Sequence, residues 1–149
     1  MIRLAVLLLL SLFALTGCPT GEGDLADLTW DPPIDDRRAG ELDFGTVAVG
    51  TNPPPSGTIQ VTNNTDEPFT MGVNCNNLQG TPFNISCPTE DTEIPAAGSE
   101  DAAGNPNNFL AVGGTLLVGP NDVGEVEATI TFDADNTIWT FALIATVTN

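Results

Sequence analysis

The feature that most constrains the fold of this chain is an alternation of apolar and polar residues with a period of two. In residues 125–132 the apolar positions are Val126, Ala128, Ile130 and Phe132, and the positions between them are glutamate or threonine. Successive side chains of a strand point to opposite faces, so this period predicts strands with one buried face. The same pattern occurs in residues 58–62, 69–75, 83–87 and 139–147.

Turn-forming residues separate these segments, most clearly at 63–68, 119–122 and 133–136. We interpret residues 42–50 as a short strand pair, and residues 110–118 as a strand interrupted by Gly113-Gly114. Residues 88–108 are polar and are predicted to form a long loop. No stretch after the N-terminal leader has a helical pattern. About seven short strands separated by turns predict an all-β protein with a β-sandwich fold.

The N-terminus has the composition of a secretory leader. Residues 4–15 are apolar except for Ser11, and Arg3 precedes them. A run of twelve residues is shorter than the ~20 that a membrane-spanning helix needs, but it suits the apolar core of a signal peptide.

The leader ends in Leu15-Thr16-Gly17-Cys18. This sequence resembles the bacterial lipobox, in which an aliphatic residue, a small residue and glycine or alanine precede a cysteine. The resemblance implies that residues 1–17 are removed and that Cys18 is acylated, which anchors the protein in a lipid bilayer. Pro19 stands where the inner-membrane retention signal has aspartate, so it favours the outer membrane of a cell with two membranes. An ordinary leader with an incidental cysteine is the alternative.

Two further cysteines, Cys75 and Cys87, continue the apolar faces of their predicted strands. An exported protein folds in a compartment that permits disulfides, so we expect the two to be bonded. Such a bond would stabilise the fold by roughly 3 kcal/mol. Two free buried thiols, or a metal site, are the alternatives, although two cysteines without any histidine make a poor set of metal ligands.

Residues 18–40 are predicted to be an acidic tether, because they contain prolines, glycines and aspartates and show little apolar periodicity. Trp30 is the exception in this segment, and it either docks on the domain or lies exposed near the membrane. Residues 41–149 are then the sandwich domain.

The charge of the chain is extreme. After loss of the leader, 20 acidic residues face two arginines, a net charge of −18, and the chain contains no lysine or histidine. Nucleic acid is therefore excluded as a partner, since phosphate binding requires clustered lysine and arginine. An acidic surface keeps an exported protein soluble, and cation binding or a salty habitat is the alternative explanation.

No catalytic constellation is present, so we predict that the protein is not an enzyme. A nucleophilic triad needs a base, and histidine is absent. Nothing in the spacing of the acidic residues favours a glycosidase pair.

Asp133, Asp135 and Asn136 are candidate Ca²⁺ ligands, although these residue types are also ordinary in turns. We expect no cofactor, with Ca²⁺ as the alternative.

Two segments resemble a known family. Leu42-Asp43-Phe44-Gly45-Thr46-Val47-Ala48-Val49-Gly50, followed by Ile59-Gln60-Val61-Thr62-Asn63-Asn64-Thr65, is similar to the opening of the HYDIN/ASPM-SPD-2-like (choice-of-anchor D) domains. The resemblance extends over residues 41–149 and is weaker in the second half. It implies an immunoglobulin-like sandwich that acts as a structural or adhesive module without catalytic residues.

Together these features predict a lipid-anchored cell-envelope protein. Its sandwich would serve as a structural or protein-binding module, with another envelope or surface protein as partner. A Ca²⁺- or glycan-binding accessory domain that uses acidic loops is the alternative.

Overall fold

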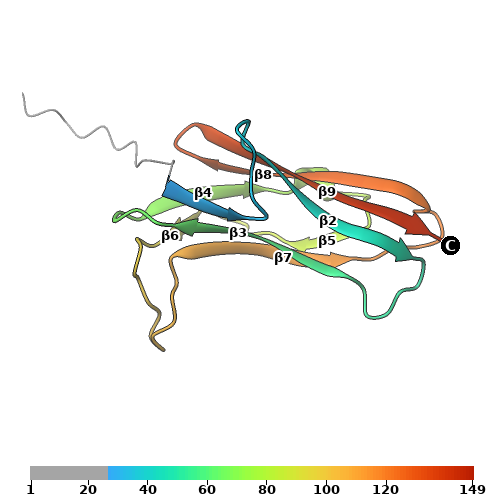
Figure 1. Cartoon of the computed structure of the whole chain (residues 1–149), viewed down its shortest axis with the longest axis horizontal. Helices are drawn as coiled ribbons and strands as arrows, with labels where there is room; N and C mark the ends of the chain where they lie inside the picture. Colours follow the sequence, from blue (N-terminus) through green and yellow to red (C-terminus); the bar gives the residue numbers. More distant parts are fainter. Residues whose placement is uncertain (1–26) are drawn as a thin grey trace, which may run out of the picture.

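The computed structural model describes residues 27–149, which form two β-sheets packed face to face (Figure 1). The first sheet has four strands in the order β1-β3-β7-β5, and the second has five in the order β2-β9-β8-β4-β6. The elements are β1 (Leu28–Asp31), β2 (Ala39–Ala48), β3 (Ser56–Asn63), β4 (Phe69–Asn74), the 3₁₀ turn η2 (Asn76–Leu78), β5 (Phe83–Ser86), β6 (Thr92–Ile94), β7 (Phe109–Leu116), β8 (Gly124–Ala134) and β9 (Thr137–Thr148).

The strand order is that of an immunoglobulin-like sandwich. The first sheet corresponds to strands A, B, E and D of that fold, and β9, β8 and β4 correspond to G, F and C. The predicted fold class is therefore confirmed. The described part of the chain has nine strands rather than about seven, since two short strands were not expected.

The first unexpected strand is β1, and it shows that the predicted start of the domain at residue 41 is wrong. Leu28–Asp31 pairs antiparallel with β3. Trp30 is buried in the core, where its ring centroid lies 5.2 Å from those of both Phe132 and Phe141. This strand lies in a segment rich in aspartate, glycine and proline, so no sustained alternation marks it, and the prolines after it lie where the chain crosses to the second sheet. Residues 28–40 thus belong to the sandwich, not to a tether.

The second unexpected strand is β6, which lies within the predicted loop 88–108. Its Ile94 is fully buried and pairs with Phe69 of β4. With only three residues, β6 is recognisable from its packing and not from its pattern.

Residues 39–48 form one strand, β2, and not the predicted strand pair. Its pairing with β9 is parallel and shifts register between Asp43 and Thr46. Gly45 adopts a φ of 72° at this shift, and its N–H donates to Asp43 Oδ1 at 2.7 Å. The glycine therefore marks a bulge within one strand.

Strand β7 runs through Gly113 and Gly114, so the predicted interruption is also wrong. A Cβ atom on Gly114 would lie 2.7 Å from the Cα atom of Ile85 in β5. The absence of a side chain at Gly114 lets the two strands approach, so the glycine permits the pairing that it was expected to break.

A fully buried asparagine holds the turn after β3. The Nδ2 group of Asn63 donates to the carbonyl oxygens of Glu67 at 2.9 Å and Pro95 at 3.0 Å. Its Oδ1 atom accepts from the backbone N–H and the hydroxyl of Thr65, at 2.9 and 2.7 Å. The Nδ2 group of Asn108 donates to the Asn63 carbonyl at 2.7 Å. One side chain thus ties the turn at 64–68 to the segment after β6, while its backbone binds the start of β7.

We predict that Asn63→Ala lowers the free energy of unfolding by about 3 kcal/mol, because several buried polar partners lose their hydrogen bonds. Urea denaturation followed by tryptophan fluorescence measures the loss. Asn84→Ala, at an exposed position of β5, is the control and should change the stability by less than about 0.5 kcal/mol. Equal stabilities of the two variants would contradict the role given to Asn63.

Candidate functional site

The predicted lipidation site lies outside the described residues. Leu15, Thr16, Gly17 and Cys18 all precede residue 27, so their roles remain predictions from the sequence. In residues 27–149 there is no helix of the length and apolarity required to cross a membrane.

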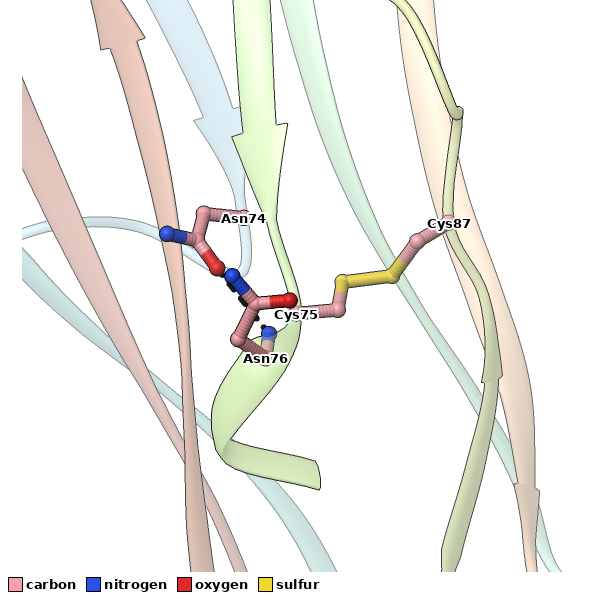
Figure 2. Close-up of a disulfide and its surroundings, with 4 residues drawn as sticks. All are labelled: Asn74, Cys75, Asn76 and Cys87. Carbon is pink, nitrogen blue, oxygen red and sulfur yellow. Dashed lines mark hydrogen bonds between the residues drawn. A yellow bond between two sulfur atoms is a disulfide. The ribbon is translucent and has the colours of Figure 1, made fainter. Parts of the chain in front are cut away.

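Cys75 and Cys87 form the predicted disulfide (Figure 2). Cys75 follows β4 in the second sheet, and Cys87 follows β5 in the first. Their Cα atoms lie 6.5 Å apart, which a disulfide spans. The bond therefore joins the two sheets beside the crossing from β5 to β6. The Oδ1 atom of Asn74 accepts from the backbone N–H of Asn76 at 2.9 Å, which holds the turn next to the bridge.

The candidate Ca²⁺ ligands lie at the β8–β9 hairpin. Asp135 and Asn136 are its two loop residues, with φ angles of 47° and 64°. Positive φ angles at both central positions are the requirement of a type I′ turn, in which Asp and Asn are favoured. Asp133 pairs with Gly72 on one side and Ile138 on the other. Within residues 27–149, no three or more histidine, cysteine, aspartate or glutamate side chains are grouped to hold a metal ion.

A shallow depression of about 350 Å³ lies on the outer face of the second sheet. Three of its lining side chains are acidic: Asp43 from β2, and Glu125 and Glu127 from β8. Asp43 and Glu127 both pair with Ile144 of β9, which places them on either side of that apolar side chain. Gly45 and Thr46, at the bulge in β2, also line this depression. The sequence showed the alternation that exposes these acids but not the parallel pairing of β2 with β9.

The loop between β6 and β7 projects from the sandwich (Figure 1) and is organised by Asp101. Its Oδ1 atom accepts from the backbone N–H groups of Ala103 at 2.8 Å and Asn105 at 2.9 Å. The pKa of Asp101 lies below its ordinary value of 3.8, chiefly because of the backbone and then the side-chain hydrogen bonds from Asn105. The acidic cluster at Glu100-Asp101 therefore includes one carboxylate that orders its own loop.

A second depression, of about 330 Å³, lies at the end of the sandwich where β7 ends and the β2–β3 loop passes. No charged side chain lines it. The sequence analysis did not identify this groove. The only available signals were the proline run at 53–55 and the Gly119-Pro120 turn, and neither showed that the two segments meet.

The comparisons with known proteins bear on the fold alone. The chain matches no protein-family model, and no curated protein matches it. It is similar to WR4, an MSP family member from C. elegans, with 14% identity, a TM-score of 0.44 and coverage of 80% of this chain and 97% of that one.

Two other solved structures have TM-scores of 0.49. One is the ASH/PapD-like domain 7 of human CEP192, with 9% identity and coverage of 83% of this chain and 86% of that one. The other is a family 123 glycoside hydrolase from Clostridium perfringens, with 14% identity and coverage of 74% of this chain but only 23% of the hydrolase. At such identities, no activity or ligand transfers from any of these proteins.

We predict that the double variant Cys75→Ser/Cys87→Ser unfolds about 3 kcal/mol more easily, because the closed loop no longer restricts the unfolded chain. The melting temperature should fall by roughly 10 °C for a domain of this size. Differential scanning calorimetry with and without reductant measures the shift. The variant should not respond to reductant, and an unreduced parent protein whose two thiols react with maleimide would refute the bridge.

We predict that Asp101 titrates below 3.8. A lowered pKa in the folded state means that the carboxylate stabilises its loop fully above pH ~4 and loses this effect as pH falls through the lowered pKa. A carboxyl-carbon NMR titration gives the midpoint. Asn105→Ala removes a side-chain donor and should move the midpoint upward, whereas an unchanged midpoint would assign the shift to another cause.

Proposed function

We propose that this protein is a cell-envelope lipoprotein, anchored through acylated Cys18, whose single sandwich is a structural or protein-binding module. The observation that carries the proposal is the lipobox-like Leu15-Thr16-Gly17-Cys18 at the end of a short apolar leader. Only nine residues, 19–27, separate Cys18 from β1 at Leu28. The sandwich would therefore be held close to the bilayer.

The physical chemistry of acyl chains supports such an anchor. Each methylene buried in the bilayer contributes about 0.8 kcal/mol to the free energy of membrane binding. Two or three acyl chains on one cysteine therefore hold a protein at the membrane, whereas a single chain binds only reversibly. An electrostatic attachment to anionic lipid would be opposed by the net charge of −18. The anchor thus supplies the attachment that the protein surface does not. Pro19 favours the outer membrane, where the cell has one.

The resemblance to HYDIN/ASPM-SPD-2-like domains supports the structural or protein-binding role. The positions that carry this resemblance serve the backbone: Gly45 forms a bulge, Gly50 has a φ of 78°, and Asn63 holds a turn. A motif composed of such positions specifies the backbone of a scaffold. The partner would be selected by surface side chains outside the motif.

The alternative, a Ca²⁺- or glycan-binding accessory domain, is the less favoured proposal. Asp135 and Asn136 occupy turn positions whose backbone angles select these residue types, so the turn already accounts for them. The Asp101 carboxylate is engaged by backbone and side-chain donors of its own loop.

We predict that Cys18→Ala abolishes incorporation of radiolabelled palmitate and leaves the leader uncleaved, since signal cleavage at a lipobox follows acylation of the cysteine. The protein should then be longer by the 17 leader residues on electrophoresis. Globomycin treatment of the parent protein should likewise leave the leader attached.

The double variant Cys75→Ser/Cys87→Ser is the matched control, because it removes thiols without touching the leader. It should keep the label and partition into the membrane fraction. An unlabelled parent protein, or a Cys18→Ala variant that is processed and partitions as the parent does, would overturn the anchor.

A further inference from the structure

We propose that the groove at the distal end of the sandwich docks a short apolar segment of another protein, one with lysine or arginine beside the apolar residues. The distal end is formed by the loops 49–55, 79–82 and 117–123. It is the end where the chain terminates in Figure 1, opposite the start of β1. The proposal deepens the protein-binding role proposed above by naming the surface and the chemistry of the partner.

The groove is preformed and largely apolar. Leu117 is 51% exposed, although its backbone N–H donates to the Pro82 carbonyl at 2.8 Å. The adjacent N–H of Leu116 donates to the Pro55 carbonyl at 3.0 Å. These two hydrogen bonds connect the end of β7 to the β2–β3 loop and to Pro82, the residue that precedes β5. The residues that line the groove are Thr51, Asn52, Pro54, Leu116, Leu117, Val118 and Gly119.

Exposure of Leu117 is thus imposed by the backbone. Leu116 is buried, so the alternation of side chains along the extended chain directs the next residue, Leu117, outward, and the bond to Pro82 holds its main chain in place. Val123, at the other end of the same connection, is 45% exposed. Fixed apolar side chains beside a groove bind with little loss of conformational entropy. The volume, about 330 Å³, lies at the lower limit of small-molecule pockets, ~300–1,000 Å³, and suits a few side chains of a peptide segment.

Charge is distributed unequally between the two ends of the sandwich. Among the described residues, the three distal loops contain one charged side chain, Asp122. Its Oδ2 atom accepts from the backbone N–H of Gly119 at 2.7 Å, so it is directed to its own turn. The connections at the opposite end, 32–38, 64–68, 95–108 and 135–136, carry both arginines and seven acidic residues.

Depletion of charge is the composition expected at the core of a protein interface. Residues 27–149 contain 18 acidic residues and two arginines, a net charge of −16, and yet the groove is neutral. An apolar segment would therefore meet no unpaired charge inside the groove, while cationic residues beside it would be attracted by Asp122 at its edge and by the net negative charge of the domain.

A second copy of the chain is the less suitable occupant. Sheets pack about 10 Å apart and strands about 4.8 Å apart, so the end of a sandwich of this size presents roughly 400 Å². A stable dimer buries about 800 Å² on each partner. Two domains of net charge −16 also repel one another. A short segment inserted into the groove avoids both difficulties.

The experiment uses the mature chain, residues 18–149, with Cys18→Ser so that no lipid is attached. Three acetylated and amidated hexapeptides, KLVLVK, ELVLVE and KSGSGK, are titrated into the isotopically labelled protein and followed by amide NMR. We expect KLVLVK to shift the amides of residues 51–52 and 116–119, with weaker binding of ELVLVE and KSGSGK. Binding of KLVLVK should weaken as salt is added, because part of it is electrostatic.

Leu117→Ser should weaken the binding of KLVLVK about fivefold, since apolar contact area is lost. The matched control is Ile138→Ser, which removes an equally exposed apolar side chain at the opposite end and should leave the affinity unchanged.

Four results would overturn the proposal: no shifts at the groove, shifts confined to the acidic sheet face, equal binding of KSGSGK and KLVLVK, or sedimentation that shows a dimer formed through Leu117. None of them depends on the anchor, because the protein is unlipidated. Failure of the groove and failure of the lipoprotein assignment are therefore distinguishable.

Discussion

The fold of residues 27–149 depends on the mutual burial of two sheet faces, since the described residues contain no α-helix to cover them. Each sheet has one apolar face, and the core lies between them, with Phe132, Phe141 and Ile59 among its fully buried side chains. A sandwich of this kind is open along both sides unless the chain closes it. Here the chain crosses from one sheet to the other on each side, from β1 to β2 and from β5 to β6.

The two crossings are secured by different means. Trp30 of β1 packs against Phe132, Trp139 and Phe141, so aromatic contact holds the first side. The disulfide between Cys75 and Cys87 holds the second. The short strands at the crossings contribute few ladder hydrogen bonds of their own, and these tertiary contacts compensate. These contacts hold the two sheets together along both sides of the sandwich, while β1, β5, β2 and β6 remain the edge strands of the sheets.

Most of the charged residues of this domain are acidic, and their placement follows the same geometry. Outward positions of β2 and β8 present Asp43, Glu125 and Glu127, because alternation on a half-buried strand leaves every second residue to solvent. The connections at the end opposite the distal loops add seven further acidic residues. Only the distal end is nearly free of charge, and there the apolar Leu117 is held outward. The domain thus presents an acidic surface and one nearly uncharged end with an exposed leucine.

How much could be predicted from the sequence varies with the length of the pattern. Long alternations, as in β8 and β9, predicted strands, inward faces and the turn at Asp135-Asn136 correctly. Cys75 and Cys87 continue the apolar faces of β4 and β5, so their pairing was also predictable. The short strands β1 and β6, of four and three residues, were missed because they lie in polar, proline-containing segments without a sustained alternation. Gly113 and Gly114 were misread because a glycine signals a break as readily as a close approach.

The sequence by itself determined the all-β class, the disulfide and the acidic character of the domain, since each depends on local pattern or composition. Tertiary structure alone decided where the domain begins and which surfaces exist. The parallel pairing of β2 with β9, the burial of Trp30 and the meeting of the β2–β3 loop with the end of β7 all join residues distant in the chain. Such contacts arise from packing of the whole sandwich, and no local rule encodes them.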